Sequence, residues 1–287
     1  MPKNKMTPPL IVLTNDDGIE SPGLRAAARA ALPLGELLVV APDRQWSSAG
    51  RGMPPSPQEH VSRHLFEADG QLAVSCDGPH RHAVAAYQVD GSPALAVLHA
   101  ALKLAPRRPA LLISGINYGE NLGSDVTSSG TVGAALEGAV IGLPSLAVSL
   151  QTPKEMHFNP SDDVDFGAAI HFTHLFARLL LTTALPFDAD VLKVDVPSDA
   201  TPETPWRLTR VSRHAYFTTV LRQQANAADS AVMDYAPLAH PERTEPDSDI
   251  YALAVDRVVS VAPLSLDLTS RIDWDKMGAL LRSSVEF

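Results

Sequence analysis

The sequence predicts an α/β fold built around a mostly parallel sheet. Residues 9–42 read as strand, helix and strand, a unit whose right-handed crossover makes its two strands parallel. Apolar runs of strand length recur at 109–115, 143–150 and 188–197, with helical patterns between them. After residue 200, short strand-like segments alternate with polar, proline-containing turns, which predicts an antiparallel extension.

The first half of the chain supplies the opening strands and two long connections. Ser21 can cap the first helix, and Pro22 suits its first turn. In order, we expect a strand at 9–14, a helix within 21–33, a strand at 36–42, a loop at 43–60, a hairpin at 64–76 that turns at Gly70, and two helical pieces within 80–105 broken near 91–93.

The second half continues the alternation and then changes character. We expect a strand at 109–115, a loop at 116–128, a helix at 128–142, a strand at 143–150, a helix at 163–183 and a strand at 188–197. Strand-like segments follow at 206–212, 215–221, 231–237 and 251–264. We therefore divide the chain into a core, 1–200, and a β-rich extension, 201–287.

Composition limits the class of protein. The chain has 287 residues, 45% of them hydrophobic and 20% charged, which is typical of a globular protein. No apolar run approaches the roughly 18 residues of a membrane span, and no signal peptide precedes the first strand, so we expect a cytoplasmic protein that binds no membrane. Cys76 is the sole cysteine, which rules out an internal disulfide.

The net charge argues against one class of partner. At −10 the chain lacks the basic character with which proteins bind nucleic-acid polymers. A small phosphorylated ligand remains compatible with this charge, because a bound cation can reverse the field locally.

Polar residues follow three of the predicted strands. Asn15, Asp16 and Asp17 follow the first strand, the loop with Ser47 and Ser48 follows the second, and residues 117–129 follow the third. Ligands of open parallel sheets bind beyond the carboxyl ends of the strands, so all three stretches should meet at one edge.

The adjacent carboxylates Asp16 and Asp17 need compensation. Two carboxylates, a hydroxyl and an amide oxygen suit Mg²⁺, Mn²⁺ or Ca²⁺, and such an ion would offset the repulsion between the acids. Gly18 fits a tight turn after them. The alternative is that Asp-Asp-Gly forms only a turn with a side-chain cap.

The stretch SSGTVGAALEG predicts an anion site at a helix start. Ser128 or Ser129 can cap the helix, and the amides of Gly130, Thr131 and Val132 lie at its unsatisfied end. An ordinary helix cap would look the same. A cation site and an anion site on one edge together indicate metal-assisted phosphoryl chemistry.

Several other site types are excluded or disfavoured. The chain contains no GxGxxG after its first strand, no GxxxxGK[ST], no GxSxG and no HExxH. The run His80-Arg81-His82 has no partner cluster nearby in sequence, so we interpret it as a polar helix start.

Four motifs together resemble a known family. LTNDDGIESPG, VVAPDRQWSSAG, LLISGINYGENLGSDV and SSGTVGAALEG, in this order and spacing, are similar to the SurE stationary-phase survival proteins, a family of nucleoside-monophosphate phosphatases. Weaker similarity continues at KVDVP and SVAPLSLDLT. The resemblance implies a Rossmann-like three-layer α/β/α core and a C-terminal extension exchanged between subunits of a homodimer or homotetramer. It also implies hydrolysis of 5′- and 3′-nucleotides and, in some members, of short polyphosphate.

The resemblance further implies roles for individual residues. One divalent ion per subunit, Mg²⁺ or Mn²⁺ and in crystals also Ca²⁺, would be held by Asp16, Asp17, Ser47 and Asn117. The phosphate site would include Asn15, Asn121, Ser129, Gly130 and Thr131.

The chain departs from the family pattern in three places. Ser128 replaces a usual tyrosine, residues 77–82 replace Gly-Thr-Pro-Ala-Asp-Cys, and the choice of Ser47 over Ser48 depends on the alignment. These departures bear on substrate preference and on the pocket wall and leave the other proposed ligands in place.

The resulting hypothesis is hydrolysis of phosphomonoesters by a water molecule activated at the metal and by Asp16 or Asp17. Direct attack by Asp16 remains an alternative. The rival hypothesis is a nucleotide-sensing module with little turnover, and a purely structural oligomer would leave the carboxylate pair unexplained.

Overall fold

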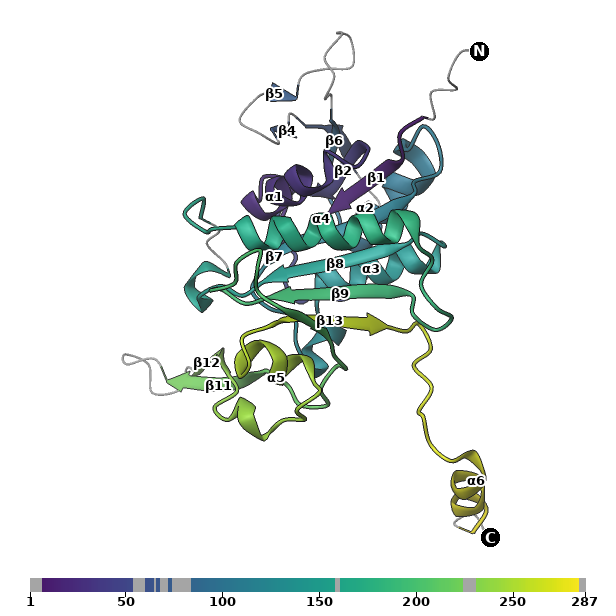
Figure 1. Ribbon diagram of the computed structural model, residues 1–287, viewed down its shortest axis with the longest axis vertical. Helices are drawn as coiled ribbons and strands as arrows, with labels where there is room; N and C mark the ends of the chain where they lie inside the picture. The colour runs from purple at the N-terminus through teal and green to yellow at the C-terminus, as the bar shows by residue number, and fades with distance from the viewer. Residues whose placement is uncertain are drawn as a thin grey trace.

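A mixed, mostly parallel sheet forms the centre of the protein. The computed structural model describes residues 7–53, 60–64, 66–67, 72–73, 84–157, 161–223 and 231–283. Within these residues six strands are parallel: β1 (Leu10–Thr14), β2 (Glu36–Pro42), β6 (Ala85–Val89), β7 (Leu111–Tyr118), β8 (Ser145–Leu150) and β9 (Val191–Val196). The apolar runs predicted as buried strands therefore form the sheet (Figure 1).

Three shorter or later strands complete the edges. On one side β3 (Val61–Arg63) pairs antiparallel to β6. On the other, β13 (Val259–Leu264) pairs antiparallel to β9, and β10 (Trp206–Leu208) pairs parallel to β13. The order is β10-β13-β9-β8-β7-β1-β2-β6-β3, so two strands from beyond residue 200 extend the central sheet.

Helices cover both faces of the sheet, which confirms the three-layer α/β/α fold. On one face lie α1 (Pro22–Ala31) and α4 (Gly167–Thr182), and on the other α2 (Pro93–His99) and α3 (Gly130–Val140). Successive side chains of a strand point to opposite faces. Accordingly Ile11 and Leu13 pack in the core under α1 and α4, whereas Val12 packs with residues of α2 and α3.

The smaller elements lie mainly in the connections. They are β4 (Phe66–Glu67), β5 (Leu72–Ala73), the π-helical turn Ala100–Leu104, the 3₁₀ turns Ser124–Thr127, Lys154–Met156 and Pro241–Arg243, and α5 (Asp249–Ala254). The pairing of β4 with β5 confirms the predicted hairpin, while its turn at Gly70 lies outside the described residues. Cys76 and residues 77–82 also lie outside them.

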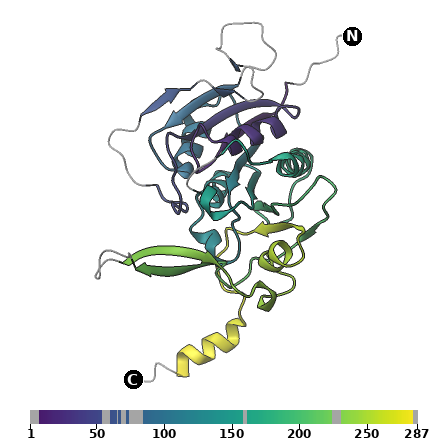
Figure 2. The ribbon, with the colours of Figure 1, turned by 90° about the vertical axis from the view of Figure 1, so that its left-hand side faces the viewer.

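Two elements project from this body. The antiparallel pair β11 (Phe217–Gln223) and β12 (Ala231–Pro237), hereafter the arm, extends sideways, as Figure 2 shows. The C-terminal helix α6 (Trp274–Ser283) stands apart at the end of an extended segment (Figure 1). The arm confirms the antiparallel extension predicted from the alternating pattern.

Three local predictions were wrong. Residues 85–89, predicted as helical, form β6, because pairing with β2 and β3 outweighs the helix propensity of the alanines. Residues 251–254, predicted as strand-like, belong to α5, whose start is capped by the Ser248 hydroxyl accepting from the Tyr251 N–H at 3.2 Å. The strand predicted to end at 115 continues to Tyr118.

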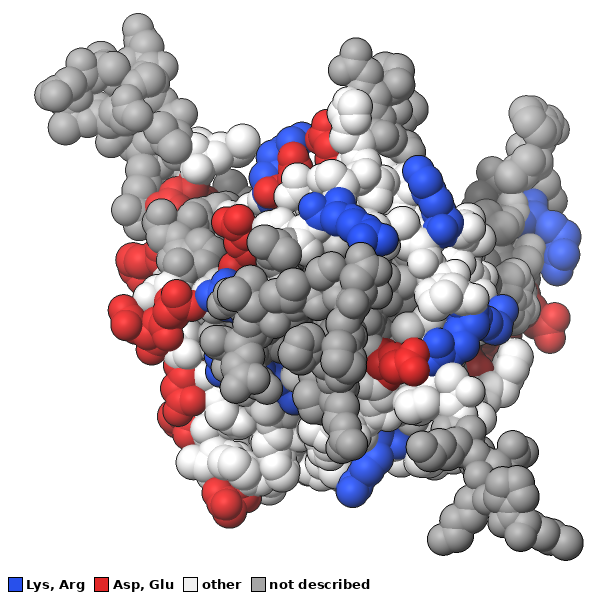
Figure 3. Space-filling model, turned by 90° about the horizontal axis from the view of Figure 1, so that it is seen from above, with Lys and Arg blue, Asp and Glu red and all other residues white. Residues whose placement is uncertain are grey.

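The described helices are short, and the charges on the face seen in Figure 3 are mixed. None of the described helices has the length and apolar character of a bilayer-spanning segment. On this face the Lys and Arg side chains of the described residues are scattered among acidic and uncharged ones.

The topology determines where polar loops meet. The chain leaves β1 for β2 on one side and later returns to β7 on the other side of β1. In open α/β sheets such a reversal creates a crevice at the carboxyl ends of the strands. The loops that follow β1, β2 and β7 therefore lie at one edge.

Candidate active site

A cavity of about 440 Å³ opens at this edge. Six of the residues predicted for the site line it: Asp16, Asp17, Ser47, Asn117, Asn121 and Ser129. The other three, Asn15, Gly130 and Thr131, are buried and are not among the residues that line the cavity. The structure thus brings the predicted residues together in two layers, one facing the cavity and one supporting it.

Asp16 lies against the start of α3. The Thr131 hydroxyl donates to Asp16 Oδ1, and the Asp16 backbone oxygen accepts from the Trp46 N–H at 2.7 Å. Burial raises the pKa of Asp16, while hydrogen bonds from Thr131 and the amide of Gly130 act in the opposite direction. The positive end of α3 therefore stabilises the negative charge of Asp16, a carboxylate of the chain itself.

Gly130 allows this close approach. A Cβ atom added at Gly130 would lie 2.7 Å from both Cβ and Oδ2 of Asp16. Any side chain here would displace Asp16 or the helix. The glycine thus makes room for Asp16, and the space beside its Cα is not open to a ligand.

Asp17 is held by two weaker donors. Its Oδ1 accepts from Gln45 Nε2 and its Oδ2 from the Tyr118 N–H, both at 3.2 Å. Burial, followed by repulsion from Asp16, raises the pKa of Asp17 well above its usual value. Among the described residues that line the cavity there is no Lys or Arg to neutralise the pair.

Ser47 and Ser48 both face the cavity from an exposed loop after β2. This loop is fastened to α3, because the Gly50 N–H donates to the Ser128 oxygen at 2.9 Å and Arg51 Nε pairs with the buried Glu137 at 2.6 Å. Ser48 has a φ of 61°, in the left-handed region. Both hydroxyls reach the cavity wall, so the choice between them stays a prediction.

Asn117 is placed by an irregularity of β7. The pairing of β7 with β8 shifts register between Ser114 and Asn117, a bulge-like feature that changes the direction of a side chain. Asn117 Nδ2 donates to the Gly119 oxygen at 2.7 Å. Because the nitrogen is engaged by the loop, the side-chain oxygen is the atom with which Asn117 can bind a cation.

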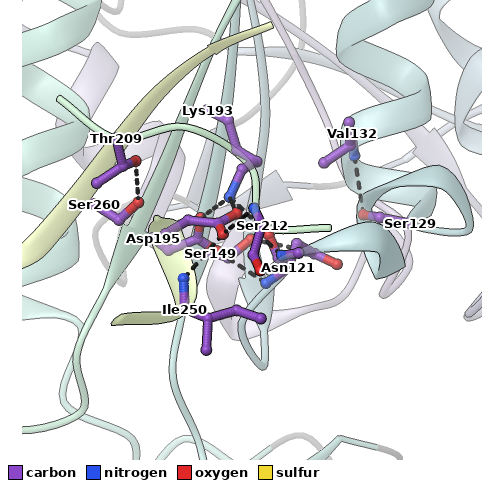
Figure 4. A network of polar contacts seen from close by, with 12 residues as sticks. Asn121, Ser129, Val132, Ser149, Lys193, Asp195, Thr209, Ser212, Ile250 and Ser260 are labelled. Atoms are coloured by element: carbon purple, nitrogen blue, oxygen red, sulfur yellow. Dashed lines mark hydrogen bonds and ion pairs between the residues drawn. The ribbon is translucent and has the colours of Figure 1, made fainter. Parts of the chain in front are cut away.

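Asn121 is positioned by a buried ionic cluster, shown in Figure 4. Its N–H donates to Asp195 at 2.9 Å, its backbone oxygen accepts from Lys193 Nζ at 2.8 Å, and its Nδ2 donates to Ser149 Oγ at 2.8 Å. Lys193 also pairs with Asp195 and, at 3.1 Å, with Asp249.

The charged members of this cluster are almost completely buried. Burial by itself would lower the pKa of Lys193, but Asp195 and Asp249 outweigh it, so the pKa is raised and the ammonium stays charged. The sequence reasoning missed this cluster. Its signal was the spacing of two charges within KVDVP, which places both side chains on one face of a buried strand.

The two remaining predicted residues stabilise a turn and a helix start. Asn15 Nδ2 donates to the Gly18 oxygen at 3.1 Å, while its buried Oδ1 has no hydrogen-bond partner in the described chain. Ser129 Oγ accepts from the Val132 N–H at 3.1 Å, which confirms the expected helix cap (Figure 4).

Sequence reasoning also missed part of the cavity wall. Glu120 lines the cavity although only 6% of its surface is exposed, and burial raises its pKa to about 7. The arm adds Phe217, Thr219, Met233 and Tyr235, and the loop after β8 adds His157. The arm therefore belongs to the cavity wall.

The cavity combines acidic groups with an aromatic wall. One loop and two strand ends bring hard oxygen donors into the cavity. Such oxygens are the preferred ligands of Mg²⁺ and Mn²⁺. No group of three or more His, Cys, Asp or Glu forms a metal cluster in the described part of the chain, so a cation here depends on the hydroxyl and amide oxygens as well as on the acids. A phosphate dianion could enter so acidic a cavity only together with a cation.

Comparisons with known proteins give a consistent result. The family model described as Survival protein SurE matches residues 11–218. The 5′-nucleotidase SurE of Thermococcus kodakarensis is 36% identical over 280 residues, covering 94% of this chain and 98% of that protein. The 5′-nucleotidase SurE of Thermococcus gammatolerans is 39% identical over 271 residues, covering 94% and 95%.

A solved structure shows the same fold. The crystal structure of the SurE protein from Aquifex aeolicus aligns with a TM-score of 0.74 at 29% identity and covers 95% of this chain and all of that one.

Proposed function

The chain belongs to the SurE family, and on that premise we propose that it is a 5′-nucleotidase that hydrolyses nucleoside 5′-monophosphates to nucleoside and phosphate. The observation that carries the proposal is the pair Asp16 and Asp17, which faces a cavity without a lysine or arginine on its described wall. Such a cavity suits an anion that enters together with a cation. Without the cation, the two carboxylates would repel the anion and each other.

We propose that Asp16, Asp17, Ser47 and Asn117 hold one divalent ion, Mg²⁺ or Mn²⁺. Bound there, the ion supplies the positive charge that offsets both carboxylates and the charge that develops on the phosphoryl oxygens. The raised pKa values of Asp16 and Asp17 support this assignment, because they express the cost of two buried acids without a counter-charge.

The remaining residues orient the substrate and move a proton. Asn121 and Ser129 bind the phosphoryl group at the side of the cavity nearest α3, supported from behind by Asn15, Gly130 and Thr131. One carboxylate of the Asp16–Asp17 pair accepts the proton of the attacking water. Asp16 is already engaged by Thr131, and Asp17 is held only by donors at 3.2 Å, which favours Asp17 as the base. Direct attack by Asp16 on the phosphorus atom is the alternative.

The activity is tested with single substitutions of the pair. With AMP and Mn²⁺ or Mg²⁺, Asp16→Asn and Asp17→Asn should each lower kcat/KM by about 10² to 10³. Asp43→Asn, which changes an exposed carboxylate just after β2, is the matched control and should keep full activity. Undiminished turnover in both variants would contradict the proposed role of the pair.

The substrate range is a finer part of the proposal. We propose that 3′-nucleotides and short polyphosphate are further substrates, and a panel of these compounds with several metals checks it. Ser128 stands on the cavity wall where the family usually has tyrosine, which motivates the alternative of a nucleotide sensor. Tight nucleotide binding without phosphate release would favour the sensor.

We also propose that the chain forms a homodimer or homotetramer through its C-terminal extension. The helix α6 has no buried residue, and its apolar side chains are exposed: Trp274 by 69%, Leu280 by 60% and Leu281 by 55%. An isolated ten-residue helix is marginal in water, so α6 needs a surface to pack against. A second copy of this chain supplies that surface in the proposed oligomer.

A further inference from the structure

The arm contributes one face of its two strands to the cavity. Thr219 of β11 pairs directly with Tyr235 of β12. Phe217 lies two residues before Thr219 on β11, and Met233 lies two residues before Tyr235 on β12. Since alternate residues of a strand share a face, all four side chains belong to one face of the arm. All four line the cavity.

Three aromatic rings on this wall form a right-angled corner, hereafter the aromatic corner. His157 and Tyr235 are nearly parallel, with an interplanar angle of 10°, and the Tyr235 hydroxyl lies 2.9 Å from His157 Nδ1. Phe217 stands almost perpendicular to both, at 84° to His157 and 81° to Tyr235, with ring centroids 5.8 and 5.3 Å away. The corner thus presents two aromatic surfaces at right angles.

The aromatic corner is fixed to the rest of the site. The N–H groups of Tyr216 and Phe217 donate to Asp125 Oδ2 at 2.9 and 2.7 Å, which fastens the start of β11. On the other strand, Lys154 binds Asp234 and lies 4.4 Å from the centre of the Tyr235 ring. These contacts hold the rings in place from both sides of the arm.

One side chain connects the aromatic corner to the carboxylate pair. Gln45 Nε2 donates to the His157 backbone oxygen at 2.6 Å and to Asp17 Oδ1 at 3.2 Å. The side-chain amide of Gln45 thus bridges a residue of the aromatic corner and a residue of the proposed cation site, and both line the same cavity. A ligand that is anionic at one end and planar and apolar at the other would match both parts.

We infer that the aromatic corner formed by His157, Phe217 and Tyr235 is the nucleobase subsite, so that the arm supplies base recognition to the site of its own chain. This inference rests on the proposed nucleotidase function, because that function provides a ligand with a phosphoryl group and a base. Every base has a π-face, and stacking on aromatic side chains contributes roughly 5- to 150-fold in affinity. The corner should accept purines and pyrimidines alike and add no affinity for phosphomonoesters that lack a base.

The test compares two substrates that differ only in the base. Tyr235→Leu should raise KM for AMP about tenfold or more and leave the kinetics of ribose 5-phosphate within about twofold. Tyr235→Phe, which keeps the ring and removes the hydroxyl, should restore most of the affinity for AMP. Thr218→Ala, on the opposite face of the arm, is the matched control and should leave both substrates unchanged.

A binding measurement separates stacking from damage to the fold. Adenosine without phosphate or metal, titrated calorimetrically, should bind the wild-type protein and lose about tenfold in affinity in Tyr235→Leu. Equal effects of Tyr235→Leu on AMP and ribose 5-phosphate, or no effect on either, would overturn the inference. If the wild-type protein hydrolysed no nucleotide, the proposed function itself would fail. If it hydrolysed AMP but Tyr235→Leu did not change KM for AMP more than KM for ribose 5-phosphate, only the base subsite would be contradicted.

Discussion

Lys193 donates a hydrogen bond from its ammonium to the backbone oxygen of Asn121 at 2.8 Å, linking a buried charge on β9 to a residue of the cavity wall. The ammonium is only 1% exposed and also pairs with Asp195 and Asp249, both fully buried. Since Asp195 accepts from the Asn121 N–H at 2.9 Å, the cluster holds this residue at both its backbone groups. The loop that carries Asn121 is therefore fixed from inside the protein.

Removing this ammonium should be costly. In Lys193→Met, Asp195 and Asp249 would be left buried without their cation, and breaking a buried pair in this way costs about 3–5 kcal/mol. We expect that loss in the free energy of unfolding, measured with urea, together with a higher KM for AMP. Lys276→Met, which removes an exposed lysine, is the control and should change the unfolding free energy by less than about 0.5 kcal/mol. A loss below 1 kcal/mol in Lys193→Met would contradict the structural role of the cluster.

Glu120 should make stability depend on pH. Burial raises its pKa from 4.5 to about 7, so between these values the folded chain keeps a proton that the unfolded chain has released. The contribution of Glu120 to stability is therefore greatest below pH 4.5 and falls as the pH rises to about 7, with a slope of up to about 1.4 kcal/mol per pH unit.

Glu120→Gln removes this dependence. The unfolding free energy of the variant, relative to the wild-type protein, should rise between pH 5 and pH 7 and level off above pH 7. Urea unfolding at four pH values measures it, with the exposed Glu20→Gln as control. A difference that stays constant with pH would show that Glu120 titrates normally.

The exposed apolar face of α6 predicts a change of oligomeric state. Charged residues in place of Trp274 and Leu281 should abolish association, because these side chains would be buried against another copy. Light scattering should give a dimer or tetramer for the wild-type protein and a monomer for Trp274→Asp/Leu281→Asp. Asp275→Asn on the same helix is the control and should keep the wild-type mass. An unchanged mass of the double variant would rule out α6 as the contact.

The central strands could be predicted because their sequences carry a strong signal. The runs that form β1, β7 and β8 are apolar, of strand length and bounded by turn residues, and such a pattern is typical of buried parallel strands. Ala85–Val89 carries no such signal. Its alanines favour a helix, and only the pairing with strands distant in sequence selects β6.

The candidate site could be predicted only in part, for a similar reason. Asp16 and Asp17 follow β1 and Asn117 lies near the end of β7, so strand order alone brings them together. The alternation in 215–221 and 231–237 predicted the arm but not what its inner face would contact. That Phe217 and Tyr235 meet His157 depends on the path of the chain after β9, for which the sequence has no local signal.

Binding of a divalent cation by the carboxylates at the end of β1 is the central property proposed for this protein. Calorimetric titration of the wild-type protein with Mn²⁺ in the absence of substrate measures this directly. We predict one Mn²⁺ bound per chain and at least tenfold weaker binding in both Asp16→Asn and Asp17→Asn, with Asp43→Asn unchanged. Wild-type protein that binds no Mn²⁺, or variants that bind it as tightly as wild type, would contradict the account.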